Sequence, residues 1–107
     1  MIDNDTHNNI DHFLCSFGLI LISSYESRKE RTKRYSVACY KKDSKEMHYP
    51  VCNEDGTTPR GTGETYEDAI IDYCEQIQNS KKAFPRLADS FMERYEYEIF
   101  DVPSLVR

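Results

Sequence analysis

One stretch of the sequence decides the fold: Gly61-Thr62-Gly63-Glu64-Thr65-Tyr66-Glu67-Asp68-Ala69. Glycine-rich backbone followed by a capping threonine is typical of the point where an extended segment runs into a helix. Thr65 is the expected N-cap, with Asp68 at the third helical position. From here the apolar residues recur every three or four positions, as Ala69, Ile70, Tyr73, Cys74 and Ile77. We therefore predict a strand-to-helix junction and an amphipathic helix that ends near Asn79.

A second amphipathic helix is predicted close to the N-terminus. Asp5-Thr6 is its expected cap and Gly18 its left-handed stop, and its apolar stripe consists of Ile10, Phe13, Leu14 and Phe17. Three strands are then predicted, over residues 19–25, 35–40 and 47–52. Pro50 has no N–H to donate to a ladder, so the third of these strands is expected at a sheet edge.

A third helix is predicted after Pro85, which suits a first helical turn. Its apolar face would consist of Leu87, Ala88, Phe91, Met92 and Tyr95, and residues 97–103 would follow as an extended tail. The predicted fold class is α+β: an N-terminal helix, a three-stranded antiparallel sheet, a helix packed on the sheet, a C-terminal helix and a tail. We expect one domain over residues 1–107, with a core at about 9–79 and the C-terminal helix and tail over 84–107.

Charge is distributed unevenly along the 107 residues. Residues 28–45 contain eight basic and two acidic residues, a sum of +6. Because the net charge of the whole chain is −5, the other residues together carry −11. The N-terminus is acidic and no apolar run approaches the roughly 20 residues of a membrane span. We expect a cytoplasmic protein that does not contact a membrane. The four cysteines are scattered singly, and we expect reduced thiols with no metal and no cofactor.

The predicted order of helix, three strands and helix resembles the double-stranded RNA-binding domain over roughly residues 9–79. Phe17-Gly18-Leu19, and the entry of Gly61, Gly63 and Thr65 into the second helix, carry this resemblance. It implies phosphate contacts from a lysine cluster at the start of that helix. Here the corresponding residues are Tyr66, Glu67 and Asp68, and two carboxylates repel phosphate. We therefore expect the RNA-binding surface of that family to be disabled.

Residues 65–69 also resemble the start of the helix in HicB antitoxins and in many small phage and mobile-element proteins. Accessory proteins of this acidic, compact kind include inhibitors that present carboxylates where a nucleic acid would place phosphates. The resemblance implies binding to a host or partner protein, such as an enzyme that handles nucleic acid. It does not identify the partner or the oligomeric state.

The C-terminal segment interleaves acidic and aromatic residues, a pattern that favours contact with another protein. It suits docking into a basic groove or strand addition at a sheet edge; alternatively, it covers the domain's own sheet. The candidate protein-binding residues are Glu93, Tyr95, Glu96, Tyr97, Glu98, Phe100 and Asp101. We expect a non-enzymatic protein-interaction module.

Nucleic-acid binding through the basic segment is the alternative function. Its candidate residues are Arg28, Lys29, Arg31, Lys33, Arg34, Lys41 and Lys42, although a solvated loop has the same composition. We predict no enzyme, because no catalytic set can be assembled. His48 and Cys52, for example, are four residues apart on a predicted strand and would lie roughly 13 Å from each other.

Overall fold

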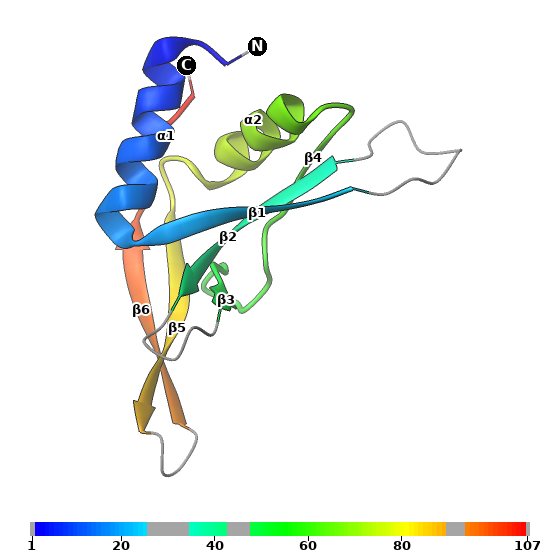
Figure 1. Ribbon diagram of the computed structural model, residues 1–107. Helices are drawn as coiled ribbons and strands as arrows, with labels where there is room; N and C mark the ends of the chain where they lie inside the picture. Colours follow the sequence, from blue (N-terminus) through cyan, green and yellow to red (C-terminus); the bar gives the residue numbers. More distant parts are fainter. Residues whose placement is uncertain (1, 26–34, 43–47, 90–93, 107) are drawn as a thin grey trace.

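The computed structural model describes residues 2–25, 35–42, 48–89 and 94–106. Among these residues, the elements in chain order are α1 (Asn4–Phe17), β1 (Leu19–Tyr25), β2 (Tyr35–Lys42), β3 (His48–Pro50), β4 (Gly61–Gly63), α2 (Tyr66–Ile77), β5 (Lys81–Asp89) and β6 (Arg94–Asp101). Strands β1 to β4 form one antiparallel sheet, while β5 and β6 form a hairpin (Figure 1). The α+β class predicted from the sequence is confirmed, but with an additional strand in the sheet.

Both ends of α1 are capped, the N-terminus by a side chain and the C-terminus by a glycine in the left-handed conformation. Asp3 is the N-cap in place of the predicted Asp5-Thr6, because its carboxylate accepts the Thr6 N–H at 2.7 Å. Gly18 ends the helix in the left-handed conformation, with φ +63°, as predicted. The last turn of α1 contains no basic residue. Lys41 of β2 places its ammonium group 2.5 Å from the Phe17 carbonyl oxygen instead, a favourable position for a cation at a helix C-terminus.

Strand β2 is the centre of the sheet. On one side β2 pairs with every residue of β1, from Leu19 opposite Lys41 to Tyr25 opposite Tyr35. On its other side β4 and β3 pair with opposite ends of the strand. Between them, at Cys39, the Tyr73 hydroxyl of α2 accepts the strand N–H at 3.1 Å and the Val51 N–H donates to the strand carbonyl at 2.9 Å. A helix side chain thus completes the ladder where the two short strands leave a gap.

The two glycines of β4 allow α2 to lie directly on the sheet. A Cβ at Gly61 would overlap the Ala69 carbonyl oxygen and the Tyr73 side chain. One at Gly63 would lie 2.6 Å from the Ala69 nitrogen, well inside contact distance. Neither glycine has a positive φ, so a turn does not explain them. Both are required because the backbone of β4 approaches α2 too closely for a side chain. The predicted N-cap of α2 is confirmed, because the Thr65 hydroxyl accepts the Asp68 N–H at 3.1 Å.

Residues 51 and 52 connect the sheet to the hairpin. Val51 bonds to β2, and Cys52 exchanges both backbone hydrogen bonds with Ala83 of β5, at 2.7 and 2.8 Å. The predicted third helix is therefore wrong: β5 occupies its first part, and β6 pairs with β5 from Lys81–Asp101 onward. The aromatic and β-branched residues of β6 favour a strand. Its backbone N–H and C=O groups on one side form hydrogen bonds with β5. Pro85 stands opposite Tyr97 in this ladder.

The segment after β6 is ordered and closes the core. Leu105 and Val102 are buried, and the Gln78 side-chain oxygen accepts the N–H groups of Leu105 and Val106 at 3.0 and 2.9 Å. Asn9 of α1 donates to the Leu105 carbonyl oxygen at 3.4 Å. The C-terminal segment therefore lies beside α1, at the end of the molecule where the chain begins (Figure 1). This position fixes β6 at its C-terminal end.

Candidate functional site

The two faces of the hairpin differ sharply in burial. Phe84 and Phe100 lie on one face and are 4% and 7% exposed, whereas Tyr97 and Ile99 lie on the other and are 62% and 57% exposed. The cause is the strand period of two, which sends alternate side chains to opposite faces. We call the face of Tyr97 and Ile99 the outer face. The register also places Pro85 opposite Tyr97 and Ala83 opposite Ile99 on this face.

The inner face holds the hairpin against the core through an aromatic cluster. The Phe100 ring centre lies 4.8 Å from that of Phe17, 5.4 Å from that of Phe84 and 6.2 Å from that of Phe13. The Lys41 ammonium lies 5.2 Å from the centre of the Phe84 ring. Phe100 was predicted as a protein-binding residue, but it is a core residue and is not available at the surface. The hypothesis that the C-terminal segment covers its own domain holds for this side chain.

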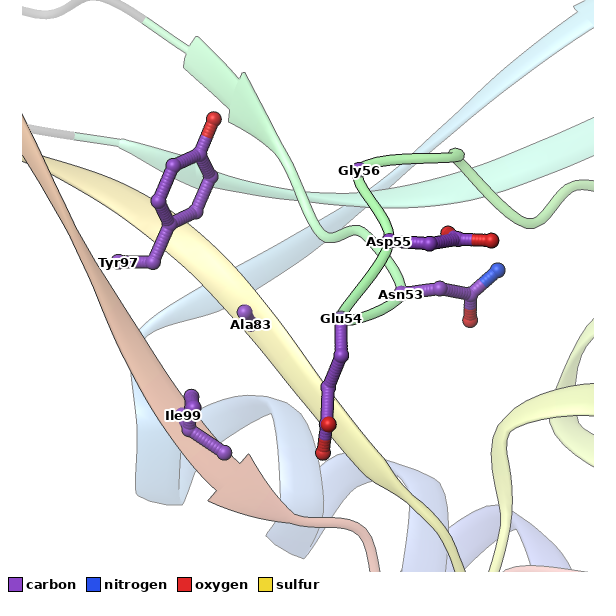
Figure 2. A pocket seen from close by; sticks show the side chains of 7 residues that line it. All are labelled: Asn53, Glu54, Asp55, Gly56, Ala83, Tyr97 and Ile99. Atoms are coloured by element: carbon purple, nitrogen blue, oxygen red, sulfur yellow. The ribbon is translucent and has the colours of Figure 1, made fainter.

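A turn over residues 53–56 borders the outer face and leaves a hollow of about 380 Å³ between them (Figure 2). Gly56 adopts φ +90° and its N–H donates to the Asn53 carbonyl oxygen at 2.9 Å. The hollow is lined by Asn53, Glu54, Asp55, Gly56, Ala83, Tyr97 and Ile99. Figure 2 shows Tyr97 on the side of the hollow opposite the turn, with Ile99 farther along the same strand. No local sequence signal indicates that this turn meets the hairpin.

Two carboxylates of the turn border the outer face. Glu54 and Asp55 line the hollow and are exposed, whereas Glu96 and Glu98, also exposed, lie on the opposite face of β6. Hydrogen bonds from the Thr57 hydroxyl and N–H, at 2.6 and 3.0 Å, lower the pKa of Asp55 below its usual range, which extends the ionised state of this carboxylate toward acidic pH. Among the side chains that the structure describes, no lysine or arginine lines the hollow. The outer face thus combines an exposed aromatic and an exposed aliphatic side chain with an acidic border.

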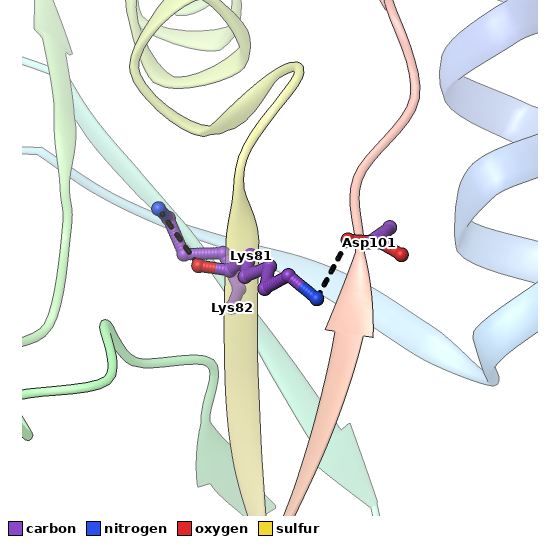
Figure 3. Close-up of polar contacts among 3 residues, drawn as sticks. All are labelled: Lys81, Lys82 and Asp101. Carbon is purple, nitrogen blue, oxygen red and sulfur yellow. Dashed lines mark hydrogen bonds and ion pairs between the residues drawn. The ribbon is translucent and has the colours of Figure 1, made fainter.

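At the base of the hairpin the charges are already paired. The Lys81 ammonium lies 3.7 Å from the Asp101 carboxylate, and both side chains are exposed (Figure 3). Lys82 points to the other side, where it is buried and donates to the Ser80 hydroxyl at 2.8 Å and to the Lys81 carbonyl oxygen at 3.3 Å. Asp101, a predicted protein-binding residue, therefore belongs to an ion pair beside the outer face.

The remaining predicted site residues are placed as follows. Glu93 and five of the basic candidates, Arg28, Lys29, Arg31, Lys33 and Arg34, lie outside the described residues. Tyr95 is in β6, opposite Leu87, and Lys42 is in β2, opposite His48. Lys41 contacts Phe17 and Phe84, so its ammonium serves the fold. Among the described residues, Glu96 and Glu98 share one face of β6 and Tyr97 lies on the other, and no set of basic candidates comes together.

The thiols and possible metal ligands form no second site within the ranges that the structure describes. All four cysteines are free, and burial raises the pKa of both Cys39 and Cys74 to about 12. No group of three or more metal-binding side chains lies together in this part of the chain. Nor does any described helix have the length and hydropathy needed to cross a membrane.

Comparisons of the chain with protein-family models, with curated proteins and with solved structures found no match. The resemblances to the double-stranded RNA-binding domain and to HicB stay predictions.

Proposed function

We propose that this chain is a protein-interaction module whose binding surface is the outer face of the β5–β6 hairpin together with the 53–56 turn. The observation that carries the proposal is the exposure of Tyr97 and Ile99 on a hairpin whose opposite face is anchored in the core. Exposed aromatic and aliphatic side chains held on a rigid element are typical anchors of protein interfaces. The proposal includes no catalytic step.

The acidic border favours a basic partner. The carboxylates of Glu54 and Asp55 border the apolar centre, in the arrangement of an apolar core with a polar rim. Glu96 and Glu98 add negative charge on the opposite face of the same strand. Charge of one sign at the rim accelerates association with a partner of the other sign and disfavours partners of the same sign. A protein that binds nucleic acid has such a basic surface, which agrees with the inhibitor function that the sequence suggested.

Capture of partners by two matched variants tests this proposal. Tyr97→Thr with Ile99→Thr removes the apolar anchors and retains residues that suit a strand. Ile20→Thr with Ile22→Thr makes the same kind of change on β1, at side chains that are 38% and 37% exposed. We expect the first variant to lose the partners that the unmodified protein captures, and the second to retain them. Equal retention by both variants would contradict the proposal.

A further inference from the structure

The outer edge of β6 is open within the part of the chain that the structure describes. β6 pairs with β5 on one side and with no other described strand. In an antiparallel strand, alternate N–H and C=O groups point to each side, so an unpaired edge presents free donors and acceptors. Such an edge is a template on which another chain can add a strand. Here it belongs to the same hairpin as the outer face.

The side chains along this edge alternate in chemistry. Glu96 and Glu98 are exposed on one face of β6, and Tyr97 and Ile99 are exposed on the other. A strand laid beside β6 would therefore meet carboxylates on one face and apolar side chains on the other. The pairing would end near Phe100, where α1 packs against the hairpin through Phe13 and Phe17.

We propose that the partner binds by adding a strand of alternating basic and apolar residues to the outer edge of β6. The inference rests on the proposed function and names the chemistry of the partner at that surface. Basic side chains would pair with Glu96 and Glu98, and apolar side chains would pack against Tyr97 and Ile99, as cross-strand neighbours do in a sheet. The added strand turns a two-stranded ribbon into a three-stranded sheet, a more stable arrangement.

A second copy of the chain fits this edge poorly. Two β6 strands paired antiparallel about Tyr97 would set Glu96 of each copy opposite Glu98 of the other. Like charges placed directly opposite each other destabilise a pair of strands. The same carboxylates that attract a basic strand therefore oppose self-association at β6. Strand β1, Leu19–Tyr25, contains no charged residue. It therefore serves as an internal control, a strand that has no carboxylates to select a basic partner.

Short peptides test the proposal directly. We would use three blocked octapeptides: alternating lysine and valine, four lysines followed by four valines, and alternating glutamate and valine. The measurements are amide chemical shifts and amide hydrogen exchange of the isotope-labelled protein. We expect the alternating lysine–valine peptide to shift and protect amides of residues 94–99, with roughly tenfold higher affinity than the other two, from two cross-strand charge pairs and the correct facing of its side chains.

Charge reversal supplies the matched control. Glu96→Lys with Glu98→Lys should transfer the preference to the alternating glutamate–valine peptide. Equal binding of the segregated peptide, a response at β1 with none at β6, or a dimer formed through β6 would overturn the proposal. If Tyr97→Thr with Ile99→Thr abolishes partner capture while no peptide affects β6, the protein-binding surface stands and strand addition fails. If capture is also unaffected, the proposed function fails with it.

Discussion

The two faces of the β5–β6 hairpin have the same backbone and opposite environments. On the inner face, Phe84 and Phe100 are buried against α1, and on the outer face Tyr97 and Ile99 are exposed above a turn. A strand whose apolar residues served only folding would keep the second pair polar, as one face of a half-buried antiparallel sheet usually is. The inner face holds the hairpin against the core, and the outer face is the surface that we propose for a partner. Substitutions on the two faces should therefore affect different measurements.

Phe100→Ala should have the largest effect. It removes a ring that contacts three other aromatic rings and leaves a cavity in the core. We expect the free energy of unfolding to fall by about 3–5 kcal/mol, measured by denaturant titration. The control is Phe100→Leu, which fills most of the volume and should lose much less. A loss below about 1 kcal/mol for the alanine variant would show that the inner face does not anchor the hairpin.

Lys41→Met should have a smaller effect on the same face. The substitution keeps most of the aliphatic length but removes the ammonium group beside the Phe17 carbonyl oxygen and the Phe84 ring. We expect a loss of roughly 1 kcal/mol in the free energy of unfolding. Lys81→Met, on an exposed side chain, is the comparison and should be close to neutral. Equal effects of the two substitutions would mean that the Lys41 contacts contribute nothing specific.

Thiol reactivity reports how firmly Cys39 of β2 and Cys74 of α2 are held in the core. Burial raises the pKa of both thiols to about 12, and only the thiolate reacts, so both stay protonated and slow at pH 8. We expect a thiol reagent at this pH to label the exposed Cys15 first in the native protein, and all four cysteines after denaturation. Mass spectrometry identifies the labelled residues. Rapid labelling of Cys39 or Cys74 in the native protein would contradict their buried positions.

Tyr97→Thr with Ile99→Thr should have the smallest effect on stability and a decisive one on binding. Both side chains are more than half exposed, so we expect the free energy of unfolding to change by no more than roughly 1 kcal/mol for the pair. Denaturant titration of this variant beside Phe100→Ala separates the faces. A loss of several kcal/mol from the outer pair would mean that these residues support the fold, which would remove the distinction between the faces.

The elements that local sequence signals define were predicted well. Gly18 and Thr65 mark their helix ends, and the buried stripe of α2 contains the five predicted residues Ala69, Ile70, Tyr73, Cys74 and Ile77. These signals act between residues a few positions apart, so they can be recognised without knowing the tertiary structure. The function of Gly61 was not visible in the same way, because the contact that requires a glycine is with α2, eight or more residues along the chain.

The hairpin could not be predicted, because its strands depend on partners that are distant in sequence. Leu87, Ala88 and Tyr95 fit a helical spacing. The extended form of β5 is selected by its pairing with β6 and by the backbone hydrogen bonds between Cys52 and Ala83. The sequence did identify Glu96, Tyr97 and Glu98 as surface candidates. It could not separate Tyr97 from Phe100, because alternation divides a strand into two faces without indicating which face is buried.

Site-specific photo-crosslinking tests the central claim most directly. A photoreactive phenylalanine analogue would replace Tyr97 on the outer face in one protein and Tyr66, an exposed tyrosine at the start of α2, in another. The account predicts covalent adducts with a basic protein from position 97 and none from position 66. Adducts from position 66 alone, or the same adducts from both positions, would contradict a binding surface on the outer face of the hairpin.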